Sequence, residues 1–406
     1  MNFSIVNYKT VKEQSDSLRI DADFYRDDSF RYLQKIDKKE KYYLKNIMLP
    51  TEIKRTYEED GIQILLAQNI KNNRLDFKNV VFMNKSFKKE LIRNKLEYHD
   101  VVITRSGANF GQTAAYKIKR EIFASIDMLV IKNANEIKGG YLSTFFNTKQ
   151  GQNLLNRGSY GMAQPHLSPS YLYQLPIPRF APNFENLIDI LINDSEKCRE
   201  DSQVLYHQTE KLVLSECKLD IWSPKHQLSF VRHYFDTKQS ERIDAEYYQP
   251  KYNEIIAVIK NYKGGWDIIK NQFKLNKSSF NIIQGNMYNY LEISGVNVSN
   301  GEIDIINVEA SELPVNAKIK LEKGNLVVSR VRTYRGAVAI IDRDGLIGSG
   351  AFTVLQENGV INKETLLVLL KSLPYSQLSL KFSRGTSYPV LMDKDILNFP
   401  IPIFEK

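Results

Sequence analysis

The sequence predicts an α+β protein with two tandem domains of similar fold, joined by a long central helix. Three observations favour this fold class. The chain has 406 residues, about twice what one domain ordinarily needs. Several segments recur in the same order in both halves, and a stretch without Gly or Pro separates the two sets. We therefore place the first domain at residues 1–183, the helix at 184–220 and the second domain at 221–406.

Four pairs of segments carry the internal repeat, which predicts a pseudo-two-fold architecture. Their offsets, where counted, lie between 223 and 225 residues. Such constancy indicates a duplicated domain, although duplication without shared function stays open. The pairs are Arg19-Ile20-Asp21-Ala22 with Arg242-Ile243-Asp244-Ala245, DVVITRSG around Arg105 with NLVVSRVR around Arg330, Arg157-Gly158-Ser159 with Arg384-Gly385-Thr386, and the Pro-Ile-Pro runs at Pro176 and Pro400.

Within each half, β-branched runs predict short strands of a twisted antiparallel sheet, and apolar residues at helical spacing predict helices after them. We expect Asp21 and Asp244 to hold a turn or to cap a helix. The expected strands are Ile62–Gln68, Val101–Thr104, Met128–Lys132, Leu326–Ser329, Ala337–Ile341 and Phe352–Leu355, and the helices are Gly140–Arg157 and Lys363–Phe382.

The central stretch has a partly apolar helical stripe and is bounded by Pro182 and Pro224. A helix of roughly 35 residues spans ~50 Å, longer than one turn of DNA at ~34 Å. It could be a plain linker, or it could pack on a second helix or a partner chain. The stripe consists of Leu187, Ile190, Leu191, Asp194, Cys198, Asp201, Leu205, Gln208 and Leu212.

The composition favours a DNA-binding protein of a reducing cytoplasm. The net charge is +9 and the pI about 9.1, which attracts polyanions, although a solvated basic surface would give the same values. The two cysteines, Cys198 and Cys217, indicate neither a disulfide framework nor a zinc site. We expect no secretory signal and no membrane span, because no long apolar run occurs.

Two polar loops in each half contain side chains suited to nucleic acid. Arginine can donate two hydrogen bonds to guanine, and Asn or Gln can pair with adenine. Exposed hairpin charges are the alternative for the arginine-rich loop at 329–338, and ordinary turn chemistry is the alternative for the second loop of each half. The candidates are Arg105, Ser106, Asn109, Gln112, Arg157, Ser159, Tyr160, Gln164 and His166 in the first half, and Arg330, Arg332, Tyr334, Arg335, Arg384, Thr386, Ser387 and Tyr388 in the second.

Catalytic motifs are missing from the sequence. It has no glycine-rich cofactor loop with an Asn-Pro-Pro-aromatic motif, as adenine methyltransferases need, and no phosphate-binding loop. Glu52-Ile53-Lys54 with Asp37 is a weak nuclease motif that the second half lacks. We predict a non-catalytic chain without cofactor or metal site.

Four kinds of segment carry a family resemblance: the R-I-D-A-x-(F/Y)-Y segments, the strands ending in Arg105 or Arg330, the Gly-Ser or Gly-Thr segments and the closing Pro-Ile-Pro runs. With them, residues ~15 to 404 resemble the specificity subunits of Type I restriction–modification systems. The resemblance implies two target-recognition domains, each reading half of a split site in double-stranded DNA. Long helices would set the spacing between the halves.

The resemblance also implies partners. Modification subunits would methylate adenine, and restriction subunits would translocate and cut DNA. These partners would use S-adenosylmethionine, ATP and Mg, and this chain none of them. The family pattern ends in a second long helix, but this sequence stops at Lys406, which leaves another subunit or a second copy to pair with the central helix. A free-standing DNA-binding scaffold and an enzyme of unrecognised type remain the alternatives.

Overall fold

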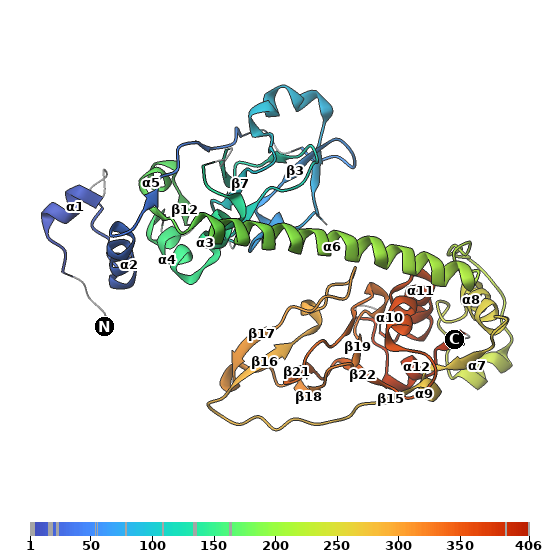
Figure 1. The fold of residues 1–406 in the computed structure, drawn as a ribbon. Helices are drawn as coiled ribbons and strands as arrows, with labels where there is room; N and C mark the ends of the chain where they lie inside the picture. The colour runs from blue at the N-terminus through green and yellow to red at the C-terminus, as the bar shows by residue number, and fades with distance from the viewer. Residues whose placement is uncertain are drawn as a thin grey trace. The chain divides into compact units, whose positions relative to one another are not determined.

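The computed structural model describes residues 5–14, 19–21, 24–52, 54, 56–77, 79–107, 109–132, 136–161, 165–385 and 388–404. The chain forms two compact units, Met1–Glu200 and Asp201–Lys406, and each contains helices and small sheets (Figure 1). The boundary falls inside helix α6, Pro182–Glu216, which has 35 residues. The α+β fold class with a long central helix is therefore confirmed, while the three functional domain ranges stay a prediction.

A four-stranded antiparallel sheet forms the centre of each unit, with the same strand order in both. Its inner strands are buried on both faces, which explains why their sequences are unbroken apolar runs. The order is β2 (Ile47–Met48), β10 (Met128–Ile131), β7 (Val101–Thr104) and β8 (Thr113–Ala115) in the first unit, and β15 (Phe273–Leu275), β22 (Phe352–Glu357), β19 (Leu326–Ser329) and β20 (Val338–Ile340) in the second.

A second sheet in each unit includes one parallel pair, which we did not expect. The parallel neighbours are β3 with β9 and β16 with β21. A long crossover separates them in sequence, and it contains the β7–β8 or β19–β20 hairpin. The first unit has β6 (Val81–Met83), β3 (Ile62–Leu65) and β9 (Phe123–Ala124), and the second has β17 (Ile306–Glu309), β16 (Met287–Leu291), β21 (Leu346–Ser349) and β18 (Ala317–Leu321).

Strand β3 is also shorter than predicted. The expected strand continued to Gln68, but β3 ends at Leu65 and a 3₁₀ turn follows at Ala67–Asn69. The Asn69 side chain accepts a hydrogen bond from the Leu66 backbone N–H at 2.8 Å, an interaction that favours turns over strands.

Each of the two long predicted helices is divided in two. The first breaks at Thr148, whose Oγ1 caps the next helix by accepting from the Gly151 N–H at 3.0 Å. The second breaks at Ser372, because Pro374 cannot donate a backbone hydrogen bond and starts a new helix instead. The four helices are α3 (Gly139–Asn147) and α4 (Lys149–Arg157), and α10 (Lys363–Lys371) and α11 (Leu373–Phe382).

Smaller elements complete the repeat. They correspond in pairs, in the same chain order in both units. Helices α1 (Tyr8–Gln14), α2 (Asp27–Asp37) and α5 (Pro169–Gln174) correspond to α7 (Tyr234–Ser240), α8 (Pro250–Lys260) and α12 (Asp393–Leu397), and the strand pair β1 (Lys41–Tyr42) with β13 (Ile177–Pro178) corresponds to β14 (Trp266–Ile268) with β23 (Pro400–Pro402). The first unit also has β4 (Ile70–Lys71), β5 (Arg74–Leu75), β11 (Ser159–Tyr160) and β12 (His166–Leu167), and the second has α9 (Ile269–Gln272).

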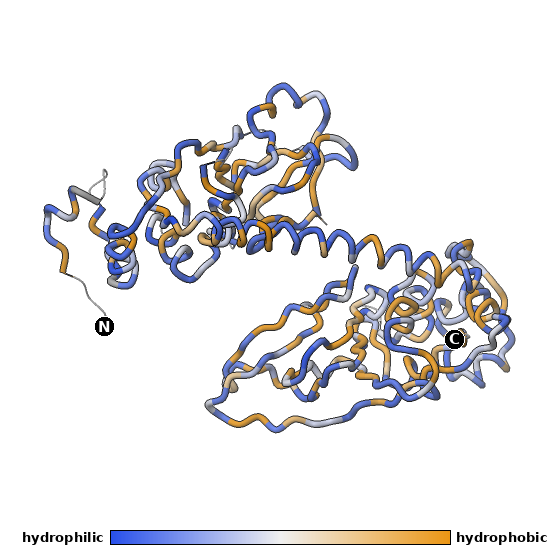
Figure 2. Tube along the Cα trace, in the orientation of Figure 1, coloured by the Kyte–Doolittle hydropathy of each residue, from blue (hydrophilic) through white to orange (hydrophobic). Residues whose placement is uncertain are grey.

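Helix α6 is fixed to each unit by different means. In the first unit Asp189 forms a buried ion pair with Lys117 at 2.9 Å and accepts from the Gly140 N–H at 2.7 Å. In the second unit Tyr206, Val213 and Leu214 pack on the apolar core. Figure 2 shows hydrophilic and hydrophobic residues alternating along α6.

Most apolar side chains of the predicted α6 stripe remain exposed. Leu187, Ile190, Leu191, Leu205 and Leu212 are 44–69% exposed, so the described part of this chain does not cover them. Packing of the stripe against another chain stays a prediction. A search of the described residues finds no helix long and apolar enough to cross a membrane.

Candidate nucleic-acid interface

In the first unit the two predicted loops lie side by side. The turn between β7 and β8 meets β12 through a bridge between Ser106 and His166, and the Leu167 N–H donates to the Arg105 carbonyl at 3.1 Å. The Arg105 Nη2 donates to the Tyr160 hydroxyl at 3.4 Å, and the rings of Tyr160 and His166 are 5.9 Å apart. Arg105, Tyr160 and His166 therefore lie together although they come from two distant segments, whereas Ser106 is only 6% exposed.

The second unit repeats this arrangement. Val331 bridges to Val390, and the Leu391 N–H donates to the Arg330 carbonyl at 2.9 Å. The Arg332 guanidinium lies over the ring of Tyr388, 4.5 Å from its centre. The β19–β20 turn and the segment after α11 thus meet as their counterparts do in the first unit.

The Arg-Ile-Asp segments hold the second loop of each unit, which confirms their predicted structural role. Asp21 pairs with Arg19 at 2.7 Å and accepts from the Phe24 N–H at 3.0 Å, and Arg19 Nη1 donates to the Arg157 carbonyl at 3.4 Å. Burial alone would raise the pKa of Asp21, but hydrogen bonds from Arg19 and the Phe24 N–H lower it overall. The carboxylate is therefore charged and fixes the arginine.

The same contacts occur in the second unit. Asp244 pairs with Arg242 at 2.7 Å and accepts from the Tyr247 N–H at 3.1 Å. Arg242 Nη2 donates to the Ser383 carbonyl at 2.9 Å, directly before the predicted loop. Each Arg-Asp pair therefore ties its own segment to the end of the α4 or α11 helix.

The predicted match of Arg157-Gly158-Ser159 with Arg384-Gly385-Thr386 is wrong. Arg157 is 5% exposed, lies over the Phe24 ring and donates to the Phe24 carbonyl at 2.7 Å. Lys381 does the same in the second unit, where it donates to the Tyr247 carbonyl at 2.8 Å and lies over that ring. The two helix ends are therefore equivalent, and the two Arg-Gly pairs lie three residues out of step.

The loop residues of the two units therefore correspond in a different register. Arg384 lies opposite Val390, as Tyr160 lies opposite His166, so Tyr160 and Arg384 are counterparts. The guanidinium of Arg157 is occupied inside its unit, and we leave Arg157 out of the proposed interface.

Two of the predicted arginines are held by acidic residues of α12 that sequence reasoning missed. Arg330 lies 3.7 Å from Asp393 and also donates to the Gly350 carbonyl. Arg384 lies 3.8 Å from Asp395. The sequence signal for these pairs is the Asp-Lys-Asp run that begins α12, but only the fold brings this run beside the two arginines.

The remaining described candidates differ in their exposure and contacts. Asn109 and Gln112 are half-buried, and the Gln112 Oε1 is a buried oxygen without a partner among the described residues. Ser159 Oγ donates to the Asn156 carbonyl at 2.7 Å, Tyr334 is half-buried and Arg335 is exposed. Gln164, Thr386 and Ser387 lie outside the described residues.

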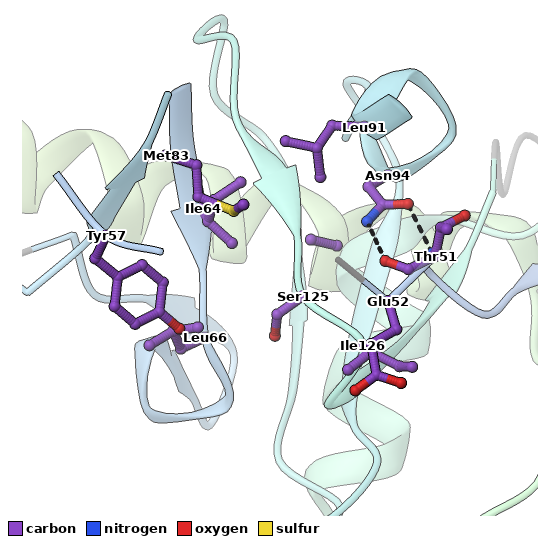
Figure 3. Close-up of a pocket in the computed structure, with 11 residues that line it drawn as sticks. Thr51, Glu52, Tyr57, Ile64, Leu66, Met83, Leu91, Asn94, Ser125 and Ile126 are labelled. Carbon is purple, nitrogen blue, oxygen red and sulfur yellow. Dashed lines mark hydrogen bonds between the residues drawn. The ribbon is translucent and has the colours of Figure 1, made fainter. Parts of the chain in front are cut away.

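The first unit also contains a pocket, shown in Figure 3, with a cavity of about 30 Å³. Ser125 lines it with a buried Oγ that has no partner among the described residues. A cavity of this size has room for ordered water. In the second unit Tyr290 takes the strand position of Ile64 and is buried there, so the two repeats differ at this point.

The described residues contain no group of side chains suited to bind a metal ion. Nowhere in them do three or more His, Cys, Asp or Glu side chains come together in a way that could hold a metal ion. Glu52 of the weak nuclease motif is exposed and lines the pocket of Figure 3, whereas Ile53 of that motif lies outside the described residues.

No protein-family model matches the chain, and no curated protein matches it either. Among solved structures, it is similar to the HsdS subunit from Thermoanaerobacter tengcongensis, with 23% identity and a TM-score of 0.30 over 34% of this chain and 38% of that one. The match thus spans well under half of that subunit.

Two further solved structures match most of the chain. One is the S subunit of a Type I restriction–modification system from M. genitalium, with 12% identity and a TM-score of 0.34 over 90% of this chain and 84% of that one. The other comes from a study of complex assembly and conformational transition of a type I R-M system, with 13% identity and a TM-score of 0.27 over 84% and 79%. These three solved structures are all of Type I restriction–modification subunits or systems.

Proposed function

We propose that this chain is the DNA-reading specificity subunit of a Type I restriction–modification complex, and that each unit binds one half of a split target. One observation carries the proposal. The same pair of polar loops meets at the same place in both units, through equivalent bridges at Ser106–His166 and Val331–Val390. Two similar surfaces on one chain suit two half-sites on one duplex.

The chemistry of the loops suits DNA. Tyr160 and Tyr388 are 47% and 63% exposed, and Arg335 is exposed in the turn between β19 and β20. Arginine side chains contact phosphates and the edges of bases. The net charge of +9 adds long-range attraction to the duplex. Within the proposal, these loops supply the sequence-reading contacts and the rest of the basic surface supplies phosphate contacts.

Partner subunits would carry out the chemistry in this proposal. The sequence lacks both the cofactor loop of an adenine methyltransferase and a phosphate-binding loop. Modification subunits with S-adenosylmethionine would methylate adenine, and restriction subunits with ATP and Mg would translocate and cut DNA. The chain itself would bind no cofactor and would act in the cytoplasm, where its target lies.

The test is to map methylated adenine by single-molecule sequencing of the genome. Cells would express the methyltransferase encoded beside this chain, either alone, with the wild-type chain, or with Arg332→Ala and Arg335→Ala combined. The proposal expects a split motif that appears with the wild-type chain and is lost or relaxed in one half with the double variant. No methylation dependent on the chain would contradict it. Specific binding of a split site by the purified chain without methylation would identify a free-standing DNA-binding scaffold instead.

A further inference from the structure

Arg332 has a left-handed backbone conformation, with φ 49° and ψ 46°. This conformation is unfavourable for a side chain with a Cβ atom. The corresponding residue of the first unit is Gly107, with φ 90°. The turns are otherwise alike: a second left-handed glycine follows four residues later, Gly111 or Gly336, and the residue before it donates to the carbonyl of Gly107 or Arg332. The second repeat therefore has an arginine where the turn favours glycine.

The surroundings hold Arg332 in this conformation. Its backbone N–H donates to the Pro389 carbonyl at 2.8 Å, and its carbonyl accepts from the Arg335 N–H at 2.9 Å. Its guanidinium lies over the ring of Tyr388. An unfavourable backbone conformation that is held from several sides is typical of functional positions.

Arg332 and Arg335 are the arginines of this turn that form no ion pair with a carboxylate of the described residues. Arg330 and Arg384 are paired with Asp393 and Asp395, whereas no carboxylate of the described residues lies within ion-pair distance of Arg332. The Arg332 guanidinium lies over the Tyr388 ring, and an arginine can donate two parallel hydrogen bonds from one edge of its guanidinium.

We propose that Arg332 reads a guanine of the half-site bound by the second unit, with Tyr388 as the platform that orients it. This inference rests on the proposed function and adds to it the base that is read and the residue that reads it. Guanine presents O6 and N7 as two acceptors in the major groove, and a paired contact from arginine is the common way to read them. The first unit, with Gly107 at this position and open space around it, has no equivalent contact.

The experiment uses the complex of this chain with its methyltransferase subunit and its mapped split site. Each guanine of the site is replaced in turn by 7-deazaguanine, which lacks the N7 acceptor. For the wild-type complex we expect one guanine, in one half-site, whose replacement weakens binding ~5- to 150-fold, the range that corresponds to one base-specific contact.

Arg332→Gly is the decisive variant, because it copies the first unit and relieves the backbone. It should bind the natural and the modified DNA equally well at that guanine and accept other bases there. Arg335→Ala is the matched control, since it removes the same charge from the same turn and should keep the sensitivity to 7-deazaguanine.

Three outcomes would overturn the inference. In the first, Arg332→Gly binds DNA as tightly as the wild-type complex and keeps its sensitivity to 7-deazaguanine. In the second, Arg332→Gly keeps that sensitivity but binds all DNA more weakly, which would make Arg332 a phosphate contact. In a third outcome, no guanine of the site is sensitive in the wild-type complex. A chain that directs no methylation and binds no split site would instead contradict the proposed function itself.

Discussion

Lys381 lies over the ring of Tyr247 and donates a hydrogen bond to the backbone carbonyl of the same residue at 2.8 Å. Arg157 has this relationship with Phe24 in the first unit. In both units a buried cation therefore joins the end of the second helix to the segment after the Arg-Ile-Asp motif. The two cations differ in one respect that can be measured, because lysine can lose its proton and arginine cannot.

We expect the stability of the second unit to depend on the protonation of Lys381. Burial, together with the charges of Arg232 and Arg242, lowers the pKa of Lys381 from 10.5 to about 8, against a smaller opposing effect of Asp244. The unfolded chain keeps the proton up to the ordinary value, so the folded state gains stability as the pH rises from 8 towards 10.5. Over this pH range the free energy of unfolding of the wild-type chain, measured with denaturant, should rise relative to that of the Lys381→Met variant.

The control is Arg157→Met in the first unit. It leaves the Phe24 carbonyl without its donor, which costs about 1–3 kcal/mol, but this loss should not change between pH 8 and 10.5. If the difference in unfolding free energy between the wild-type chain and Lys381→Met also stayed constant between pH 8 and 10.5, Lys381 would have its ordinary pKa.

Asp244→Asn should weaken recognition of one half-site only. The change removes the ion pair with Arg242, which fixes the Ser383 carbonyl before the second loop. We expect a loss of about 1 kcal/mol in stability, because the pair is partly exposed. Binding to DNA with one scrambled half-site measures each unit separately.

Asp21→Asn is the matched change in the first unit, where Asp21 holds Arg19 in the same way. It should affect the other half-site. If both variants weakened the same half-site, or both half-sites equally, the two units would not act as independent readers.

The repeat and the inner strands could be predicted because their signals are local. Strands β7 and β19 were predicted to the residue, since burial on both faces makes an unbroken run of apolar residues. The break at Ser372 does not follow from periodicity, because apolar residues continue at helical spacing across it. The break at Thr148 lies in a polar stretch and depends on the capping contact of its Oγ1 with Gly151. The parallel pairs were missed because strand pairing over a long crossover leaves no local pattern.

The candidate site could be predicted only in part, because local sequence signals mark its loops but not the contacts between them. Polar turn residues marked both loops, but the contact between them depends on the fold. The Arg-Gly dipeptide misled the comparison, because Arg157 and Arg384 have the same identity but different environments: one is buried on Phe24 and the other is paired with Asp395. Burial of a cation cannot be read from its neighbours in sequence.

Gly140→Ala should loosen the attachment of α6 to the first unit. A Cβ at this position would lie 2.8 Å from Asp189 Oδ1 and 2.9 Å from Asp189 Cα, so either α3 or α6 would have to shift. The buried pair between Asp189 and Lys117 would be disturbed as well. We expect a loss of about 1–3 kcal/mol, measured as a lower unfolding temperature of the first unit.

Gly139→Ala is the control for this change. Its Cβ would come no closer than 3.4 Å to another atom, an acceptable contact, and alanine favours helix over glycine by about 1 kcal/mol. The variant should therefore be neutral or slightly stabilised. Equal destabilisation by both changes would point to the helix start itself and not to its contact with Asp189.

Lengthening α6 should lengthen the spacer between the two half-sites. Seven helix-forming residues inserted between Ser202 and Gln203, where the helix is exposed, add about 10 Å, nearly two whole turns. At about 3.4 Å for each base pair, the methylated motif should gain about three base pairs of spacer, while both half-sites keep their sequence. Replacing residues 200–205 by alanine and glutamate without a change of length should leave the spacer as it is. An unchanged spacer after the insertion would show that α6 does not act as the ruler, since the two readers would then be positioned by something other than the length of this helix.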